Sequence, residues 1–339
     1  MNAGWMMRGM AALALMPVLM TPGAWAQSCT TQAKMSTEEY AALSDVALGL
    51  ATAVKAGDTA RVEALSSADL AGNFTATGFL VRGTADKIAG ETLRVTQLYE
   101  LDATQRMAND PAVAEFSCLL AGTTAETDFA IPALPPGFYG FAMVEASGGA
   151  RPWLLAFVLR RDAGVWKLAG FSAHARTAAG HEGVWFWAKA RERAAVKENW
   201  AAWVLFGEAY ELLRPASFVT STNLDKLLAE QKAASPPELA DGIAAGNPMV
   251  LKGAGDAEYR FTGIGAEGSD DGQRLNLMLH VEVDSMADAT AAKVYNAAAA
   301  KALLDAHKEL RQGFDGVWVF AEVKGQAPYA TELKMGEIQ

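Results

Sequence analysis

The sequence predicts an α+β fold from three successive patterns. Apolar residues recur with helical spacing after residue 36, strand-length apolar runs replace them from residue 113, and an aromatic, Ala-rich helical pattern follows from residue 181. Helices that precede a run of antiparallel strands are typical of the α+β class. The expected units are a leader at 1–26, an α+β domain with a curved antiparallel sheet at 27–176, a helical hairpin at 177–232, a linker at 233–250 and a small β-β-α-β-β domain at 251–339.

The first 26 residues have the layout of a secretory signal peptide. Arg8 is their only charge, an apolar run follows at 10–20, and Ala24 and Ala26 place small residues where a signal peptidase reads. That run is too short to cross a bilayer core about 30 Å thick as a helix, and no later run is long enough. A buried N-terminal helix or an uncleaved anchor is the alternative. We expect a mature bacterial protein from Gln27, periplasmic or secreted, with no transmembrane segment.

The two cysteines, Cys29 and Cys118, allow one intramolecular disulfide. An oxidising compartment permits such a bond. A lipid anchor on Cys29 is the alternative, but the leucine that a lipobox places three residues earlier is Ala26 here. The two outcomes exclude each other, because a lipidated Cys29 leaves Cys118 unpaired. We expect the disulfide.

The first domain begins with a helix and ends with strands. Ser36 and Glu39 form a capping box, and Gly57 ends the helix that they begin. Residues 153–159 are apolar on both alternating faces, so this strand should be covered on both sides. The remaining expectations are a short helix at 58–65, an extended stretch to 83, helical character at 84–98, and strands at 113–120, 127–131, 138–146, 152–160 and 164–174.

The stretch W-L-L-A-F-V-L-R-R-D-A-G-V-W-K-L-A-G-F at 153–171 resembles the last hairpin of NTF2-like domains, which include the SnoaL-type polyketide cyclases. The resemblance implies a cone-shaped sheet wrapped on helices, often around a pocket, where an Asp or His base faces aromatic walls. Asp102 and Asp128 are candidates by residue type. Tyr139, Trp153 and His174 are the residues that we select as candidate binding residues. No catalytic motif of the family is matched, so no catalytic residue is assigned.

Residues 181–214 resemble a single tetratricopeptide-type helical hairpin, with Phe186, Ala190, Ala202, Phe206 and Ala209 at its packing positions. One such hairpin cannot bury its own apolar face, so it should dock onto a neighbouring domain or a partner. The same span holds four tryptophans. Their aromatic faces suit sugars or peptides, but we expect them to pack between the helices. They are Trp185, Trp187, Trp200 and Trp203.

The C-terminal part reads as a second α+β unit. Proline and glycine at 233–248 mark the linker. Leucine and valine alternate with polar residues over 275–283, which indicates a half-buried strand. The expected order is strands at 258–264 and 273–283, a helix at 287–311, and strands at 315–323 and 329–335.

Several function classes are disfavoured. The net charge of −10 and the absence of a basic run argue against nucleic acid as a partner. The G-x-G-x-x-G match at 263–268 precedes an acidic turn and a strand rather than a helix, so no dinucleotide cofactor is expected. His174 and His181 fit no metal-ligand spacing, and Ser172 lacks the second glycine of a nucleophile elbow. We assign no metal site.

These observations predict a non-catalytic binding or protein-interaction module whose partner is a small molecule or a protein. The alternative is a small-molecule enzyme, an isomerase, cyclase or hydrolase, that uses an NTF2-like pocket. A hollow cone lined by polar groups would favour the enzyme. A solid core beside an exposed apolar groove near residues 185–203 would favour the binding module.

Overall fold

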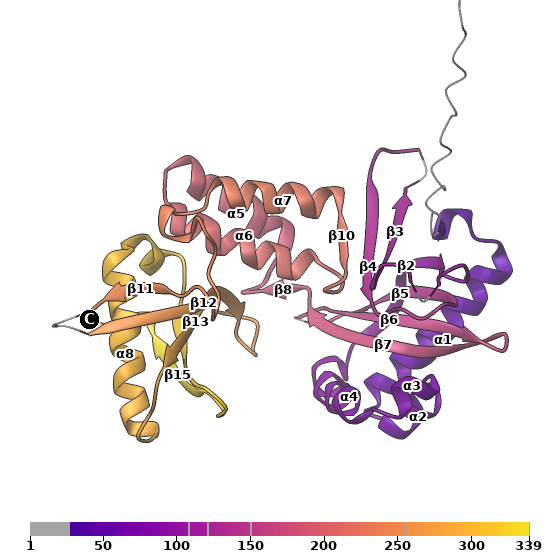
Figure 1. Ribbon diagram of the computed structural model, residues 1–339, viewed down its shortest axis with the longest axis horizontal. Helices are drawn as coiled ribbons and strands as arrows, with labels where there is room; N and C mark the ends of the chain where they lie inside the picture. Colours follow the sequence, from indigo (N-terminus) through magenta and orange to yellow (C-terminus); the bar gives the residue numbers. More distant parts are fainter. Residues whose placement is uncertain are drawn as a thin grey trace, which may run out of the picture.

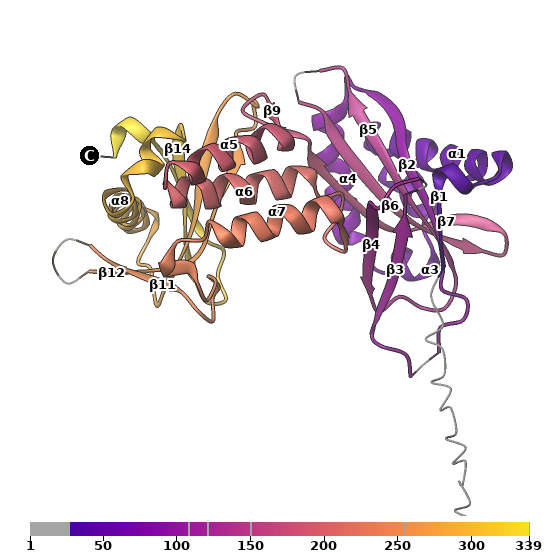
Figure 2. The ribbon, with the colours of Figure 1, turned by 90° about the horizontal axis from the view of Figure 1, so that it is seen from above.

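The computed structural model describes residues 28–338 apart from positions 108, 121, 150, 254 and 256. The predicted signal peptide lies outside the described residues. Helices and mostly antiparallel sheets make up the chain, which confirms the α+β class. Two five-stranded sheets lie at opposite ends of the molecule, and three helices lie between them (Figure 1 and Figure 2). In the described residues no helix combines the length and apolar character needed to cross a membrane.

The N-terminal sheet is antiparallel throughout and has the strand order β1-β2-β5-β6-β7. Its strands are β1 (Ser28–Thr31), β2 (Thr92–Asp102), β5 (Phe138–Ser147), β6 (Trp153–Asp162) and β7 (Val165–Ala175).

Helices cover one face of the N-terminal sheet. The predicted capping box is confirmed, because the Ser36 hydroxyl accepts a hydrogen bond from the Glu39 amide and the Glu39 carboxylate accepts one from the Ser36 amide. Leu43 and Leu50 are fully buried against the sheet. The helices of this face are α1 (Thr37–Lys55), α2 (Thr59–Ala64), α3 (Ala68–Ala71) and α4 (Thr75–Ile88).

The expectation for residues 66–98 is wrong in two places. The stretch predicted as extended contains α3 and most of α4, and the stretch predicted as helical contains the end of α4 and the start of β2. Glycine and threonine lower helix propensity only modestly. Val81, Thr84 and Ile88 lie on one helical face and are buried, so tertiary packing decides in favour of the helix.

A three-stranded sheet, which we call the cover sheet, lies on the opposite face. Its order is β10-β4-β3, and it packs an aromatic core onto β2, β5 and β6. The predicted Cys29–Cys118 disulfide is confirmed and joins β1 to β3 across a Cα–Cα distance of 5.4 Å. Both faces of β6 are buried, as the sequence predicts. The strands of the cover sheet are β3 (Val113–Leu119), β4 (Glu126–Pro132) and β10 (Val219–Ser221).

Three helices follow β7 and the short strands β8 (Thr177–Ala178) and β9 (His181–Glu182). Trp187 donates its indole N–H to Glu230, and Arg191 donates two hydrogen bonds to the same carboxylate, which ties the third helix to the first. Trp200 is buried, whereas Trp185 is 41% exposed and stacks on the His181 ring. These helices are α5 (Gly183–Ala195), α6 (Asn199–Leu213) and α7 (Thr222–Ala233).

The C-terminal sheet has the order β11-β12-β13-β14-β15, with β13 and β14 parallel and joined by α8. It contains one strand more than the predicted β-β-α-β-β order, because Met249 buries its side chain and pairs opposite Phe261. The alternation over 275–283 is confirmed as a half-buried strand. The elements are β11 (Met249–Lys252), β12 (Glu258–Gly268), β13 (Leu275–Val283), α8 (Ala289–Ala306), β14 (Gly316–Val323) and β15 (Tyr329–Lys334).

The α5–α6 hairpin and the C-terminal sheet share one hydrophobic core. Phe206 and Ala209 of α6 belong to the same buried cluster as Leu277 of β13 and Leu303 of α8. The hairpin thus buries its apolar face inside its own chain. β8 precedes this hairpin and β10 follows it, on the side that faces the N-terminal half of the molecule, and β10 joins the cover sheet (Figure 1). The hairpin thus lies between the two five-stranded sheets.

Candidate functional site

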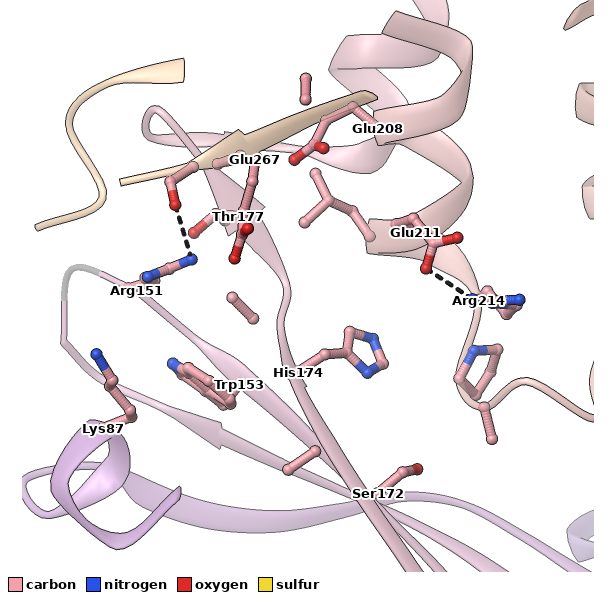
Figure 3. Close-up of a pocket in the computed structure, with 18 of the residues that line it drawn as sticks. Lys87, Arg151, Trp153, Ser172, His174, Thr177, Glu208, Glu211, Arg214 and Glu267 are labelled. Atoms are coloured by element: carbon pink, nitrogen blue, oxygen red, sulfur yellow. Dashed lines mark hydrogen bonds and ion pairs between the residues drawn. The ribbon is translucent and has the colours of Figure 1, made fainter. Parts of the chain in front are cut away.

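A pocket of about 590 Å³ lies where three segments meet: the open end of the β6–β7 hairpin, the C-terminal half of α6 and the end of β12. We call it the junction pocket (Figure 3). Its walls come from segments that are far apart in the sequence, and it mixes charged, aromatic and apolar side chains. Pockets of this volume accommodate small molecules.

Glu208 is the most deeply buried acid of the junction pocket. It lies on α6 among apolar neighbours and is only 5% exposed. Burial raises the pKa of Glu208 to about 8, and the nearby carboxylates of Glu267 and Glu211 contribute to that rise. The guanidinium of Arg151 opposes it. Glu208 is therefore mostly protonated, and uncharged, at neutral pH.

His174 forms a second wall from the end of β7, opposite Leu154 of β6. Burial lowers the pKa of His174 to about 4, and the guanidinium groups of Arg176 and Arg214 add to that shift. The imidazole is therefore neutral at neutral pH. Its Nε2 atom is buried and has no hydrogen-bond partner among the described residues.

Arg151 and Trp153 form the third wall. The Arg151 guanidinium lies over the Trp153 ring at 5.9 Å from its centroid, and Nη2 lies 3.5 Å from the Gly268 carbonyl oxygen. Arg151 Nε and Trp153 Nε1 are both buried without a hydrogen-bond partner in the part of the chain that the structure describes. Buried polar atoms are nearly always paired, so these two nitrogens and His174 Nε2 need hydrogen-bond partners that the described residues do not supply.

Two ion pairs lie at the rim of the junction pocket. Lys87 of α4 contacts Asp270 at 2.7 Å, which ties the N-terminal helices to the turn after β12. Arg214 contacts Glu211 at 2.7 Å at the end of α6. Among the described residues, no three histidine, cysteine, aspartate or glutamate side chains gather closely enough to hold a metal ion.

The structure brings two of the three selected binding residues into the junction pocket. Trp153 and His174 line it, whereas Tyr139 is 1% exposed in the core under the cover sheet and donates its hydroxyl to the Pro135 carbonyl. The two aspartates also lie elsewhere. Asp102 accepts hydrogen bonds from Thr104, and Asp128 accepts one from Ser117.

The space between the N-terminal sheet and its helices is filled rather than hollow. Leu43, Leu50, Leu155 and Phe157 are fully buried there. The junction pocket lies at the end of this sheet instead of inside a cone.

Sequence reasoning missed Glu208, Arg151 and Glu267. One local signal was available for Glu208, because this glutamate interrupts an otherwise apolar face of the helix at 199–213. A charged residue on a buried helix face rarely serves packing alone. Arg151 and Glu267 carry no comparable signal.

Comparisons with protein-family models, with curated proteins and with solved structures give no match for this chain. The NTF2-like and tetratricopeptide-like resemblances therefore stay predictions.

Proposed function

We propose that the protein is an exported binding protein that holds a small polar organic molecule in the junction pocket. One observation carries the proposal. Arg151 Nε, Trp153 Nε1 and His174 Nε2 are buried, unpaired among the described residues, and gathered around one pocket. Export rests on the predicted signal peptide, and the Cys29–Cys118 disulfide is compatible with it.

The energetic argument concerns the cost of unpaired polar groups. Each buried donor or acceptor without a partner costs about 1–3 kcal/mol. A ligand that supplies hydrogen-bond acceptors to Arg151 and Trp153, and a hydrogen-bond partner to His174 Nε2, removes that cost when it binds. The arrangement is thus unfavourable in the free protein and favourable in the complex.

A second candidate function is acid–base catalysis in the same pocket, and one observation favours it. The raised pKa of Glu208 keeps a proton on this carboxyl group at neutral pH. Enzymes use such groups as general acids. Turnover of a bound compound that stops in a Glu208→Gln variant would establish this function in place of simple binding.

The test of binding is native mass spectrometry of the protein exported by a bacterial host, with and without an added library of polar metabolites. We expect a retained small molecule in the native protein and loss of most of its occupancy in Trp153→Phe, which removes the indole N–H. The matched control is Trp166→Phe, since Trp166 belongs to the same β6–β7 hairpin and is buried in the helix-covered core but does not line the junction pocket.

Equal occupancy in the two variants would place the ligand outside the junction pocket. Absence of any bound compound, at every library concentration, would overturn the proposed function.

A further inference from the structure

The junction pocket has one more acidic side chain than basic side chains. Its acids are Glu208, Glu211, Glu267 and Asp270, and its bases are Lys87, Arg151 and Arg214. Two acids are matched, because Asp270 pairs with Lys87 and Glu211 pairs with Arg214. Glu208 and Glu267 have no ion pair or side-chain hydrogen bond with the residues that the structure describes.

The remaining base does not neutralise these two acids. Nη2 of Arg151 donates to the Gly268 carbonyl, and its guanidinium group lies over the Trp153 ring. Glu208 extends from α6 and Glu267 from β12, and both carboxyl groups project into the same part of the pocket (Figure 3). The pocket therefore holds two carboxyl groups without a counter-charge of their own, one of them almost fully buried.

The apolar lining of the pocket indicates that the remainder of the ligand is a carbon skeleton. Trp153 and His174 supply aromatic surface, and Leu212 and Ala178 supply aliphatic surface beside the two acids. The unpaired N–H groups of Arg151 and Trp153 can donate to an oxygen of the ligand.

Resting on the proposed function, we infer that the junction pocket binds a small organic amine as its cation. The ammonium group lies between the carboxyl groups of Glu208 and Glu267, and the carbon skeleton lies against Trp153 and His174. An ammonium group has three donors and no acceptor, which suits two carboxylates that lack hydrogen bonds.

Binding of the cation changes the protonation of Glu208. Burial and the carboxylates of Glu267 and Glu211 raise the pKa of Glu208 to about 8, while Arg151 opposes this rise and His174 stays uncharged. An ammonium group favours the ionised carboxylate, so Glu208 releases its proton when the amine binds at neutral pH. As the pH rises toward the pKa of Glu208, the affinity for the amine should increase about tenfold per pH unit, and it should level off above that pKa.

The experiment compares three compounds that share one skeleton and differ in charge: phenethylamine, phenethyl alcohol and phenylacetate. Isothermal titration calorimetry of the mature protein at pH 6, 7 and 8.5, in two buffers of different ionisation enthalpy, measures affinity and proton release. We expect phenethylamine to bind at least about tenfold more tightly than the other two, because only its ammonium group can pair with the Glu208 carboxylate that forms on binding.

Two variants locate the charge. Glu208→Gln keeps the shape of the side chain but cannot ionise, so it should lose at least about tenfold in amine affinity, together with the pH dependence. The control is Glu192→Gln, which removes a carboxylate of the neighbouring helix α5 outside the pocket. Glu192 is paired with Lys189, so its loss should change the affinity by less than about threefold.

The outcomes separate this inference from the proposed function. Tight binding of the alcohol or the acid, without the amine, would overturn the amine assignment and leave the binding function intact. Equal losses in the two glutamine variants would overturn the position assigned to the ammonium group. If none of the three compounds binds and the exported protein retains no molecule, the proposed function fails as well.

Discussion

The two five-stranded sheets differ in how many of their faces are covered. Helices bury one face of the N-terminal sheet and the cover sheet buries the other, so Phe157 and Val158, neighbours on β6, lie in two different cores. The C-terminal sheet is covered on one face only, by α6 and α8. On its other face His280 stacks on Phe320, and its Nδ1 atom lies 2.7 Å from Glu322, with these side chains half-exposed.

This difference explains where the junction pocket lies. A sheet that is packed on both faces commits most of its central side chains to a core, so side chains near the strand ends are more accessible. Trp153 begins β6 and His174 lies near the end of β7. Those positions form the edge at which α6 and β12 approach, and they are available to a ligand.

We expect the largest effect from removing the disulfide that joins the N-terminal sheet to the cover sheet. Replacing Cys29 and Cys118 with serine removes a bond between residues 89 positions apart. The free energy of unfolding of this half should fall by about 4–5 kcal/mol, because the bond restricts the unfolded chain. Hydrogen exchange followed by mass spectrometry should show faster exchange in β1 to β7 and unchanged exchange in β11 to β15. An equal increase in both sheets would show that the halves unfold as one unit.

The next prediction compares one residue type on a covered and an open face. Phe157 is fully buried and stacks on Phe171 at 5.2 Å, whereas Phe320 is only half-buried. Phe157→Ala should cost about 3–5 kcal/mol, and Phe320→Ala less than about 2 kcal/mol. Urea denaturation of the two variants measures the difference. Similar losses would mean that the open face is covered in solution.

The same difference in coverage made the sheets predictable from sequence. A continuous apolar run at 153–159 indicates burial on both faces, and strict alternation at 275–283 indicates burial on one, because successive strand residues point to opposite faces. Residues 66–98 were not predictable in this way. Gly78 and Thr84 obscure the helical period of α4, and their burial follows from contacts that the local sequence does not contain.

The candidate site was predictable only in part. Trp153 and His174 stand out by residue type on one hairpin. Tyr139 does not line the junction pocket with them, because its strand position turns its ring toward the cover sheet. Glu208 and Glu267 come from segments more than 30 residues further along the chain, and no local spacing reveals that tertiary packing brings them together.

A prediction of intermediate size concerns the place where the two regions meet. The folded state raises the pKa of Glu208 from its usual 4.5 to about 8, so it holds the proton more tightly than the unfolded chain. The associated stability is present below pH 4.5 and is lost as the pH rises toward 8, by about 3 kcal/mol at pH 7. Glu208→Gln should abolish this decline, measured by urea denaturation at pH 5, 6, 7 and 8.

The pH dependence of stability that His174 contributes has the opposite sign to that of Glu208 and serves as an internal control. Its lowered pKa makes stability fall as the pH drops from 6.5 toward 4, and Glu208→Gln should leave that fall intact. Glu211→Gln should keep the decline of the native protein between pH 5 and 8. Parallel profiles for the native protein and Glu208→Gln would contradict the raised pKa.

The smallest effect compares one glycine in each sheet. Gly140 of β5 faces α1, and a methyl group there would lie 2.6 Å from Leu43 Cδ1 in a filled core. Gly265 of β12 pairs with Met278 on the open face and has nothing within 4 Å of that position. Gly140→Ala should destabilise the protein by about 1–3 kcal/mol through overpacking. Gly265→Ala should be neutral or stabilise it by up to about 1 kcal/mol, because alanine restricts the unfolded chain more than glycine does.

A second substitution identifies the cause of the Gly140 effect. If the clash with Leu43 is responsible, Leu43→Ala should make Gly140→Ala nearly harmless, so the two changes should be strongly non-additive in a double-mutant cycle. Additive losses would instead mean that the strand itself requires glycine. A harmless Gly140→Ala in the native background would mean that α1 can withdraw from β5. The helix-covered face of the N-terminal sheet would then be no more tightly packed than the open face at Gly265.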